Sequence, residues 1–377
     1  MSVTPAPPDP AIILDAHLDI AYNVIRNGRV FTQSVYAQRR REAALSPAQI
    51  RQLEGVITVA LPEALLGRVG IAFGTLFVSP AGNHDFGDAA ISYNTPREAY
   101  DQALKQLDVY QRLADDGLIQ LIRSRAELTA VLDTWRPGSE FADHRLGIVI
   151  SMEGADPILE PRQFEEWYAR GVRAVGPAWA GTRYSGGVVG SIFQPGPLTS
   201  LGRELLEVMS HFGALLDLSH MTDEAFSEAL DLYDGPIIAS HSSPRKFYDN
   251  PRSLSDDMLR SLAERDGVVG IPLYNRFLQP DWRSGKGGKA SVTLIGNVIP
   301  AIDHICQITG SAQHVGIGTD LDGGFGWEAI PAEFDTITDL NLIGPALRAR
   351  GYAADDVAAV LHGNFLRMLR RSLPDSV

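Results

Sequence analysis

Cysteine is almost absent from this chain. Cys306 is the only one among 377 residues, so an intramolecular disulfide is excluded. Basic residues are also in deficit: 33 lysines and arginines face 46 aspartates and glutamates, and the formal net charge is −13. Nucleic acids and anionic membrane surfaces both attract basic protein surfaces. The composition therefore argues against nucleic-acid and membrane partners.

Long apolar runs are missing too. No stretch approaches the ~20 apolar residues of a membrane-spanning helix. Residues 1–10 contain prolines and small residues without a basic start or an apolar run, so they read as a disordered leader rather than a secretory signal. With 45% hydrophobic residues, the remaining 11–377 can form a core without disulfides. We expect one domain over these residues and a cytoplasmic location.

Several nucleotide-binding and hydrolase motifs do not occur: GxGxxG, GxxxxGK[ST], GxSxG and HExxH. What recurs instead is a short apolar run followed by a helix-like segment. Apolar strands alternating with helices indicate a parallel sheet, and eight units favour a closed (β/α)8 TIM barrel over a doubly wound open sheet. The predicted strands cover 13–19, 69–78, 146–154, 173–179, 214–220, 236–241, 267–274 and 314–320.

Helices and loops follow from local signals. The clearest helix is predicted over 95–116, with Thr95 as its N-cap and Gly117 as its stop. Two additional C-terminal helices are expected over 341–371. The glycine-rich segment 181–200 has no periodicity and is predicted to be a loop.

Side chains that bind metals stand at the C-terminal ends of five predicted strands. They are His17, Asp19, Glu153, His220, His241 and Asp320. Each alone could be a hydrogen-bonded polar strand end, but the ends of barrel strands meet at one mouth. Three carboxylates and three histidines packed there would be costly without a cation, so the sequence predicts a metal centre. The other histidines are not expected to be metal ligands, and His84, which follows the second strand, is the hardest of them to exclude.

The number of candidate ligands favours two ions. Six exceed the four ligands of a tetrahedral zinc site, so two divalent metal ions, preferably Zn²⁺, are expected. A carboxylate such as Glu153 can bridge such a pair, with a hydroxide between the ions as the nucleophile. Asp320 would take the proton from the attacking water and return it to the leaving group. This arrangement predicts hydrolysis of an amide or an ester.

At this point the chain resembles the membrane (renal) dipeptidase family, peptidase family M19, among the amidohydrolase-type barrels. The matching segments run through almost the whole chain: Asp15-Ala16-His17-Leu18-Asp19, Met152-Glu153-Gly154, Asp217-Leu218-Ser219-His220, Ser240-His241-Ser242-Ser243, Arg252 ahead of Ser255-Asp256-Asp257, and Gly316-Ile317-Gly318-Thr319-Asp320-Leu321-Asp322-Gly323.

The resemblance assigns roles to these residues. It implies a zinc dipeptidase in which His17, Asp19 and Glu153 hold one ion, while Glu153, His220 and His241 hold the other. It further implies that Asp320 is the acid/base and that Arg252 binds the carboxylate of a dipeptide. A guanidinium fork matches a carboxylate with two parallel hydrogen bonds, which agrees with that role. The family also suggests a homodimer.

Trp179 departs from the family's pattern, which usually has a histidine here that contacts the scissile carbonyl oxygen. Indole can donate a hydrogen bond but cannot become cationic. Arg183 or Tyr184 on the following loop could donate instead, or Trp179 could wall a differently shaped pocket. The alternative functions are hydrolysis of another small amide, an N-acyl amino acid or a lactone, and metal binding without catalysis.

Overall fold

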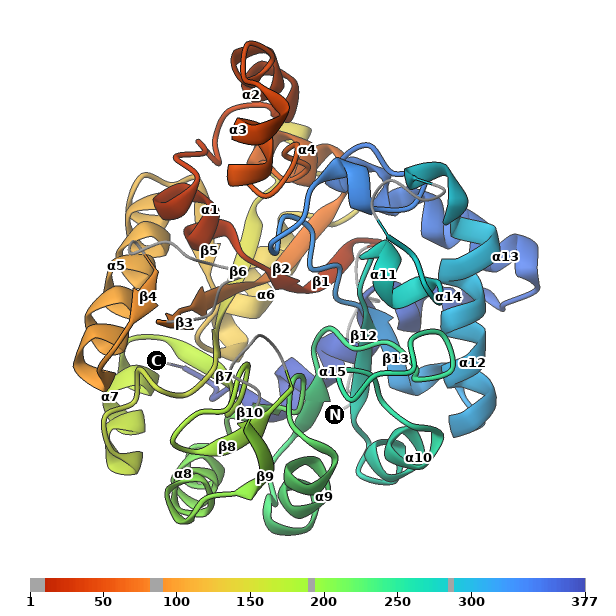
Figure 1. Ribbon diagram of the computed structural model, residues 1–377. Helices are drawn as coiled ribbons and strands as arrows, with labels where there is room; N and C mark the ends of the chain where they lie inside the picture. The colour runs from red at the N-terminus through yellow and green to blue at the C-terminus, as the bar shows by residue number, and fades with distance from the viewer. Residues whose placement is uncertain (1–10, 82–90, 189–193, 284–287, 377) are drawn as a thin grey trace, which may run out of the picture.

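The computed structural model describes residues 11–81, 91–188, 194–283 and 288–376. Within these ranges, eight parallel strands close into a barrel, because the first strand pairs with both the second and the last of the series (Figure 1). The predicted (β/α)8 architecture is confirmed. The barrel strands are β1 (Ile13–Leu18), β2 (Val69–Phe77), β6 (Leu146–Glu153), β7 (Val172–Gly176), β10 (Leu215–Asp217), β11 (Ile237–Ala239), β12 (Val268–Ile271) and β13 (Val315–Ile317).

Helices form a layer around these strands (Figure 1). The predicted helix over 95–116 is α5, and the Thr95 hydroxyl accepts a hydrogen bond from the N–H of Glu98 as its cap. The helices are α1 (Ile20–Arg26), α2 (Val35–Glu42), α3 (Pro47–Gln52), α4 (Leu61–Leu66), α5 (Pro96–Asp115), α6 (Arg125–Asp133), α7 (Phe164–Ala169), α8 (Ser200–His211), α9 (Asp223–Leu232), α10 (Asp256–Glu264), α11 (Asn275–Leu278), α12 (Ile299–Thr309), α13 (Ile343–Arg350), α14 (Ala354–Ala358) and α15 (Asn364–Ser372).

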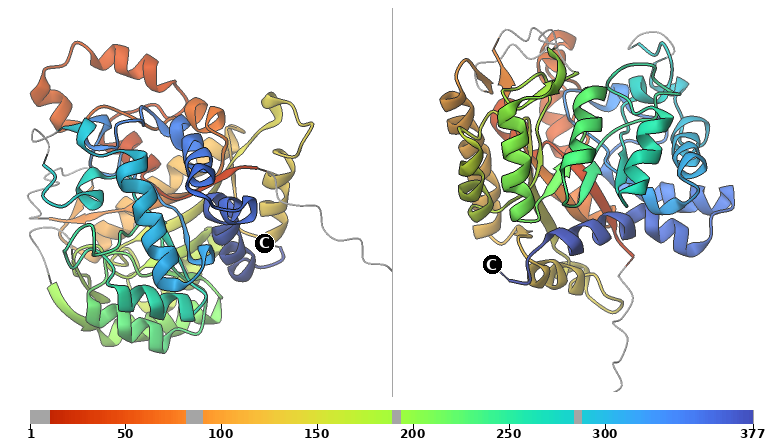
Figure 2. Two further views of the ribbon diagram at one scale, coloured as in Figure 1. Left: turned by 90° about the vertical axis from the view of Figure 1, so that its right-hand side faces the viewer. Right: turned by 90° about the horizontal axis from the view of Figure 1, so that it is seen from below.

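The last helix closes one end of the barrel. Figure 2 shows α15, in dark blue, crossing the end of the barrel at which the strands begin. Its residues Phe365 and Leu369 are buried in one cluster with Ile12 and Leu14 at the start of β1 and with Ile71 and Phe73 of β2. The additional C-terminal helices are therefore present, and they leave the carboxyl ends of the strands as the mouth.

Three segments differ from the sequence prediction. The first comprises β3 (Ser79–Pro80) and β4 (Ser92–Tyr93), which pair with each other and were not predicted. The stretch 181–200, expected to be a loop, contains the antiparallel strands β8 (Ser185–Gly187) and β9 (Gln194–Leu198). Its glycines give no apolar alternation, so the pattern held no strand signal, and Gly187 packs against the backbone of Ala180 too closely for a Cβ. A three-residue strand on β6, β5 (Ile119–Leu121), was also not predicted.

The connection from β1 to β2 is long. It carries four helices, of which α2 and α3 stand out from the barrel at the top of Figure 1. This excursion returns to the barrel mouth through residues 55–59, where the backbone N–H groups of Thr58 and Val59 donate to the Asp322 carboxylate. The connection between β1 and β2 is thereby tied to the loop that follows β13.

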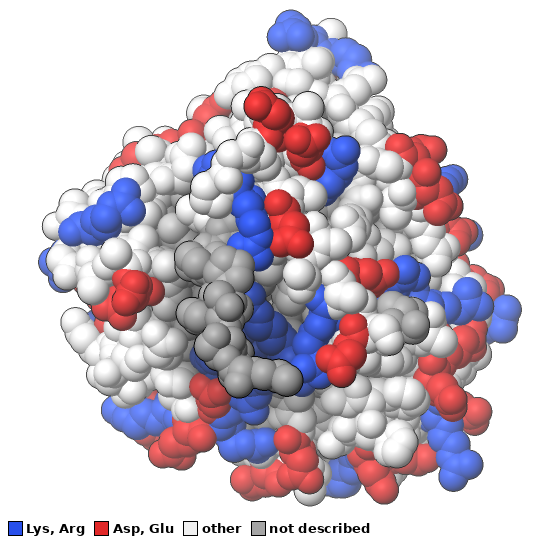
Figure 3. Space-filling model, turned by 180° about the vertical axis from the view of Figure 1, so that it is seen from behind, with Lys and Arg blue, Asp and Glu red and all other residues white. Residues whose placement is uncertain are grey.

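The surface carries both signs of charge. Figure 3 shows the face behind Figure 1, where basic and acidic side chains are interspersed. No helix in the described ranges is long and apolar enough to cross a bilayer. The leader predicted for 1–10 and the uncertain His84 both lie outside the described residues.

Candidate metal centre

The six predicted ligands come together at the barrel mouth. His17 and Asp19 lie at the end of β1, Glu153 ends β6, and the others directly follow β10, β11 and β13. Their ligand atoms form overlapping groups whose members all lie within 4.8 Å of one another. These groups are His17–Asp19–Glu153, Glu153–His220–His241 and His17–His241–Asp320.

Glu153 faces imidazoles on two sides. Its Oε1 lies 2.9 Å from Nε2 of His220 and 3.4 Å from Nε2 of His241. Its other oxygen, Oε2, lies 3.6 Å from Nε2 of His17. The two oxygens of one carboxylate are thus shared between two ligand groups, as in a bridging position.

The donor atoms fit a divalent cation. Nε2 of His17 and Oδ1 of Asp19 are buried without a hydrogen-bond partner among the described residues. Asp19 begins α1, where an aspartate normally caps the helix, yet its carboxylate makes no capping bond. Its Oδ2 instead lies 3.4 Å from Nε2 of His17. Imidazole nitrogens and carboxylate oxygens suit zinc and similar metals, which would satisfy these atoms.

Burial and charge shift the titration of the cluster. Burial raises the pKa of Glu153 to about 8 and that of Asp320 to about 7. Burial likewise lowers the pKa of His220 and of His241 well below its ordinary value. At His17 burial also opposes the charge, but the nearby carboxylates outweigh it and raise the pKa to about 10. The carboxylates thus draw protons into the site, and a metal ion would compete with those protons.

Metal affinity should therefore rise with pH. Ligands bind metal in their deprotonated forms. For each unit that the pH lies below the pKa of a ligand, competition from the proton lowers the metal affinity of the site up to about tenfold. With pKa values of about 8 for Glu153 and about 10 for His17, affinity should climb most steeply up to about pH 8, where both groups bind a proton, and more gently from there to about pH 10. Competition with a chromophoric chelator across this range measures it, and a flat profile would contradict it.

Two of the candidate ligands have unusual backbones. His220 has φ 67° and Asp320 has φ 59°, in the left-handed region that non-glycine residues rarely adopt. Such conformations cost on the order of 1–3 kcal/mol and persist where surrounding contacts hold them. One such contact at Asp320 is the hydrogen bond from its N–H to the carbonyl of His17, at 3.3 Å.

Asp217 and Ser240 orient His241. The Asp217 carboxylate accepts hydrogen bonds from the N–H of Ser219 at 3.0 Å, and from the N–H and hydroxyl of Ser240 at 2.9 and 2.5 Å. The Ser240 hydroxyl oxygen lies 2.8 Å from Nδ1 of His241. Contacts to the far nitrogen of a metal-binding imidazole fix its ring orientation, so this chain sets the direction of Nε2.

Asp15 performs a similar task between β1 and β13. Its carboxylate accepts from the N–H of His17 at 3.2 Å and from the N–H and hydroxyl of Thr319 at 2.8 and 2.5 Å. Burial raises the pKa of Asp15 to about 6. No separate role was predicted for Asp15 or Asp217 from the sequence. The available signal was an acidic residue two or three positions before a histidine at two separate strand ends.

Gly323 leaves room for two of the carboxylates. A Cβ at this position would overlap the carboxylate of Asp320 and lie 2.9 Å from Oδ2 of Asp19. Gly323→Ala should therefore displace both groups and lower metal affinity or activity roughly 10- to 100-fold. The matched control is Gly363→Ala, where the nearest atom, the carbonyl oxygen of Ala358, is 3.4 Å away. Equal metal retention in the two variants would contradict this.

Arg252 lies beside the ligands and is buried. Its terminal nitrogens donate to the carbonyl of His241 at 2.7 Å and to the hydroxyl of Ser242 at 3.1 Å, while its Nε has no hydrogen-bond partner among the described residues. Its positive charge lowers the pKa of Glu153 and of Asp320, against the larger effect of burial. The guanidinium therefore supports His241 and stands close enough to the mouth to interact with its charges.

Trp179 lines the same cavity as five of the six candidate ligands, all but His17. This cavity, of about 320 Å³, is also lined by Tyr22, Phe77, Gly323 and Gly324. The indole packs edge-on against Phe77, with ring centroids 4.9 Å apart, and its ring lies 6.4 Å from that of His220. Trp179 thus forms an aromatic wall beside the metal centre, as one of the two sequence hypotheses expected.

Arg183 and Tyr184 do not line this cavity. The guanidinium of Arg183 donates to the carbonyls of Ile158 and Leu159, at 2.7 and 3.2 Å, and lies 3.4 Å from Asp156. The Tyr184 hydroxyl donates to the carbonyl of Ile158 at 2.5 Å and is fully buried. The structure therefore does not bring either side chain to the cavity wall, and both hold the segment after β6.

Fold and site together define a metal-dependent hydrolase built on a (β/α)8 barrel. The chain belongs to the membrane dipeptidase family (peptidase family M19), whose family model matches residues 9–373. An uncharacterized protein in the pqqA 5′ region of Klebsiella pneumoniae is 30% identical over 285 residues, which cover 74% of this chain and 98% of that protein. An uncharacterized dipeptidase of Schizosaccharomyces pombe is 27% identical over 304 residues, covering 80% and 70%.

Two solved structures share the fold. A metallopeptidase from Rhodobacter sphaeroides, liganded with a phosphinate mimic of the dipeptide L-Ala-D-Ala, matches with a TM-score of 0.75 at 24% identity, covering 97% of this chain and 100% of that one. The probable dipeptidase PvdM from Pseudomonas aeruginosa matches with a TM-score of 0.74 at 20% identity, covering 96% and 95%. At these identities the likeness concerns the fold.

Proposed function

We propose that this protein is a dipeptidase that uses two divalent metal ions, most naturally zinc, to hydrolyse the peptide bond of small dipeptides. The observation that carries the proposal is the position of Glu153, whose two oxygens face different imidazoles and which belongs to two of the ligand groups. Membership of the dipeptidase family supports the same substrate class.

The residues divide the work as follows. His17 and Asp19 would hold one ion and His220 and His241 the other, with Glu153 shared. When bound, such ions polarise the scissile carbonyl and make a water molecule nucleophilic at neutral pH. Asp320, which belongs to a ligand group with His17 and His241, would take a proton from the water and deliver it to the leaving amine.

Cavity size and walls favour a small substrate. Tyr22, Phe77 and Trp179 crowd the space beside the candidate ligands and leave room only for a small ligand. Trp179 and Phe77 form an apolar wall, and Trp179 supplies no group that can become cationic beside the carbonyl oxygen. Stabilisation of that oxygen would therefore depend on the metal centre.

Arg252 is proposed to bind the free carboxylate of the dipeptide. Arg252→Met should raise KM for dipeptides roughly 10- to 100-fold, because a charge-assisted hydrogen bond contributes about 1.5–3 kcal/mol. Amide substrates that lack the carboxylate should be affected far less. Arg245→Met is the matched control, since Arg245 lies on the same loop and pairs instead with Asp223 at 2.7 Å. An equal increase in KM on both substrate types would contradict the proposed anchoring role of Arg252.

A second candidate function follows from Trp179. A site with an aromatic wall in place of an ionisable donor could prefer another small amide, an N-acyl amino acid or a lactone. A panel of L-L and L-D dipeptides, acyl amino acids and lactones, assayed with the zinc-loaded protein, separates the candidates. Turnover of dipeptides supports the proposal, turnover of acyl or lactone substrates alone replaces it, and metal binding without turnover indicates a binding protein.

A further inference from the structure

Asn23 lies on α1 directly behind the metal centre and uses every hydrogen-bonding position of its side chain. Its amide nitrogen donates to the carbonyl of Asp19 at 3.1 Å and to the carbonyl of Asp322 at 2.9 Å. Its amide oxygen accepts from Arg29 at 2.9 Å and from Asn27 at 3.0 Å. Because the cationic Arg29 can only donate, the orientation of the carboxamide is fixed.

The two carbonyls that Asn23 joins belong to different parts of the barrel. Asp19 follows β1, whereas Asp322 lies in the loop that carries Asp320 after β13. Asp320 and Asp322 both have left-handed backbones, with φ of 59° and 62°, so this loop needs outside contacts to keep its shape. The side chain of Asn23 is the direct polar link between the backbone of Asp19 and that of Asp322.

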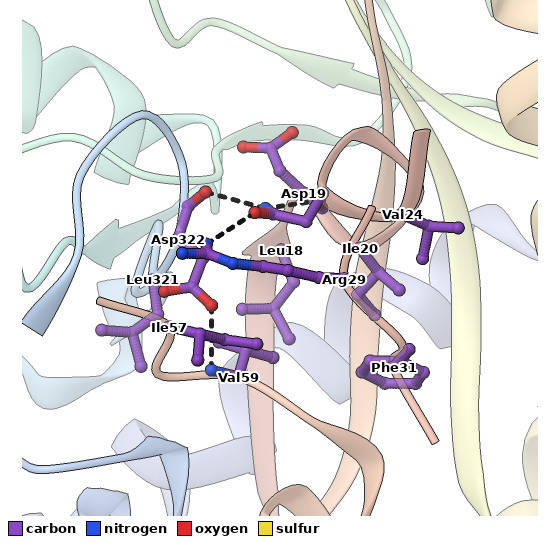
Figure 4. A pocket seen from close by; sticks show the side chains of 11 residues that line it. Leu18, Asp19, Ile20, Val24, Arg29, Phe31, Ile57, Val59, Leu321 and Asp322 are labelled. Carbon is purple, nitrogen blue, oxygen red and sulfur yellow. Dashed lines mark hydrogen bonds between the residues drawn. The ribbon is translucent and has the colours of Figure 1, made fainter. Parts of the chain in front are cut away.

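A network of buried charges supports this link. Figure 4 shows Asp19, Arg29 and Asp322 side by side along a second cavity of about 300 Å³, and Asp19 lines this cavity as well as the metal cavity. The second terminal nitrogen of Arg29 donates to the carbonyl of Gly55 at 2.6 Å. The Asp322 carboxylate accepts from the N–H and hydroxyl of Thr58 at 2.9 and 2.7 Å. Residues 55–58 of the β1–β2 connection are thereby hydrogen-bonded both to Arg29 and to the loop that carries Asp322.

We propose that Asn23 is a positioning residue of the metal centre: its carboxamide sets the distance between Asp19 and Asp320, and Arg29 orients it. The inference rests on the metal centre of the proposed function but not on the substrate. If Asn23 only stabilised the fold, its loss would lower the melting temperature without changing how the site holds metal. If it positions the two carboxylates, its loss changes the coordination itself.

Asn364 supplies a matched comparison. It is also a buried asparagine on a helix, and its amide nitrogen also donates to two carbonyls, those of Ala312 and Val315, both at 2.7 Å. These carbonyls lie at the start of β13, whereas the metal centre lies beyond its end. Asn364→Ala therefore removes a similar pair of amide-to-carbonyl hydrogen bonds, at the end of the barrel opposite the metal centre.

The test is Co²⁺ binding to the metal-free full-length protein, followed by competition with a chelator and by the visible absorption spectrum. Asn23→Ala should bind Co²⁺ roughly 10- to 100-fold more weakly and with an altered spectrum, as expected when a group that orients metal ligands is lost. Asn364→Ala should lose thermal stability while keeping wild-type affinity and spectrum. Asn23→Ser is a milder second variant, which should change affinity and spectrum in the same direction.

Wild-type affinity and spectrum in both Asn23 variants would overturn the inference. An equal weakening in Asn364→Ala would overturn it too, since the effect would then be one of general stability. The outcome is separable from that of the proposed function. Failure of the Co²⁺-loaded wild type to hydrolyse any dipeptide would count against the substrate, while a weakened Asn23→Ala site would still support the positioning role.

Discussion

Replacing Glu153 with glutamine is expected to strip the centre of its metal and abolish hydrolysis. Both Glu153 oxygens face imidazoles of different ligand groups, so a neutral amide weakens both groups at once. The substitution also removes one negative charge from a buried site that must balance divalent cations. Metal analysis of the purified variant should find well under one ion per chain, and turnover should fall to background.

The control for this variant is Glu127→Gln. Glu127 pairs with Arg123 at 2.6 Å and belongs to none of the ligand groups. It should retain both metal and activity. A Glu153→Gln protein that kept two ions per chain would contradict the bridging role, whatever its activity.

Asp320→Asn is expected to separate catalysis from metal binding. Asparagine has the shape of aspartate but cannot accept and return a proton, and a positioned acid/base contributes roughly 10²- to 10⁴-fold to such reactions. The rate constant for hydrolysis should fall by that factor, while the groups built on Glu153 keep their metal. Parallel measurement of kcat and metal content checks the prediction.

Loss of metal from the Asp320→Asn variant would contradict this prediction. Asp320 also belongs to a ligand group with His17 and His241. Loss of metal together with activity would therefore make it primarily a ligand, and the proton would have to be carried by another group. In that case restoring activity with excess metal would distinguish weakened binding from lost proton transfer.

Much of the barrel could be predicted because its strands are buried on both faces. Runs such as Val69–Phe77 and Leu146–Glu153 are predominantly apolar and buried along their whole length, as is typical of parallel strands. The convergence of the candidate ligands followed from the fold, because the C-terminal ends of barrel strands share one mouth. Six residues from distant parts of the chain could thus be assigned to one centre.

The remaining features depend on contacts that no local pattern encodes. Strands β8 and β9 pair through glycine-rich sequence, and Arg183 and Tyr184 turn away from the site because carbonyls of Ile158 and Leu159 accept their hydrogen bonds. Asp15, Asp217 and Asn23 act through backbone groups of other segments. The roles of such residues can be recognised only from the folded structure, because their partners are distant in the sequence.

The central claim, a two-metal dipeptidase, is tested most directly by titrating the metal-free protein with Zn²⁺ while following hydrolysis of L-Ala-D-Ala and a panel of L-L dipeptides. We expect no turnover without metal and a rise that levels off at two equivalents of Zn²⁺ per chain. Turnover by the metal-free protein, or full activity at one equivalent, would contradict the account, as would failure to cleave any dipeptide at saturating Zn²⁺.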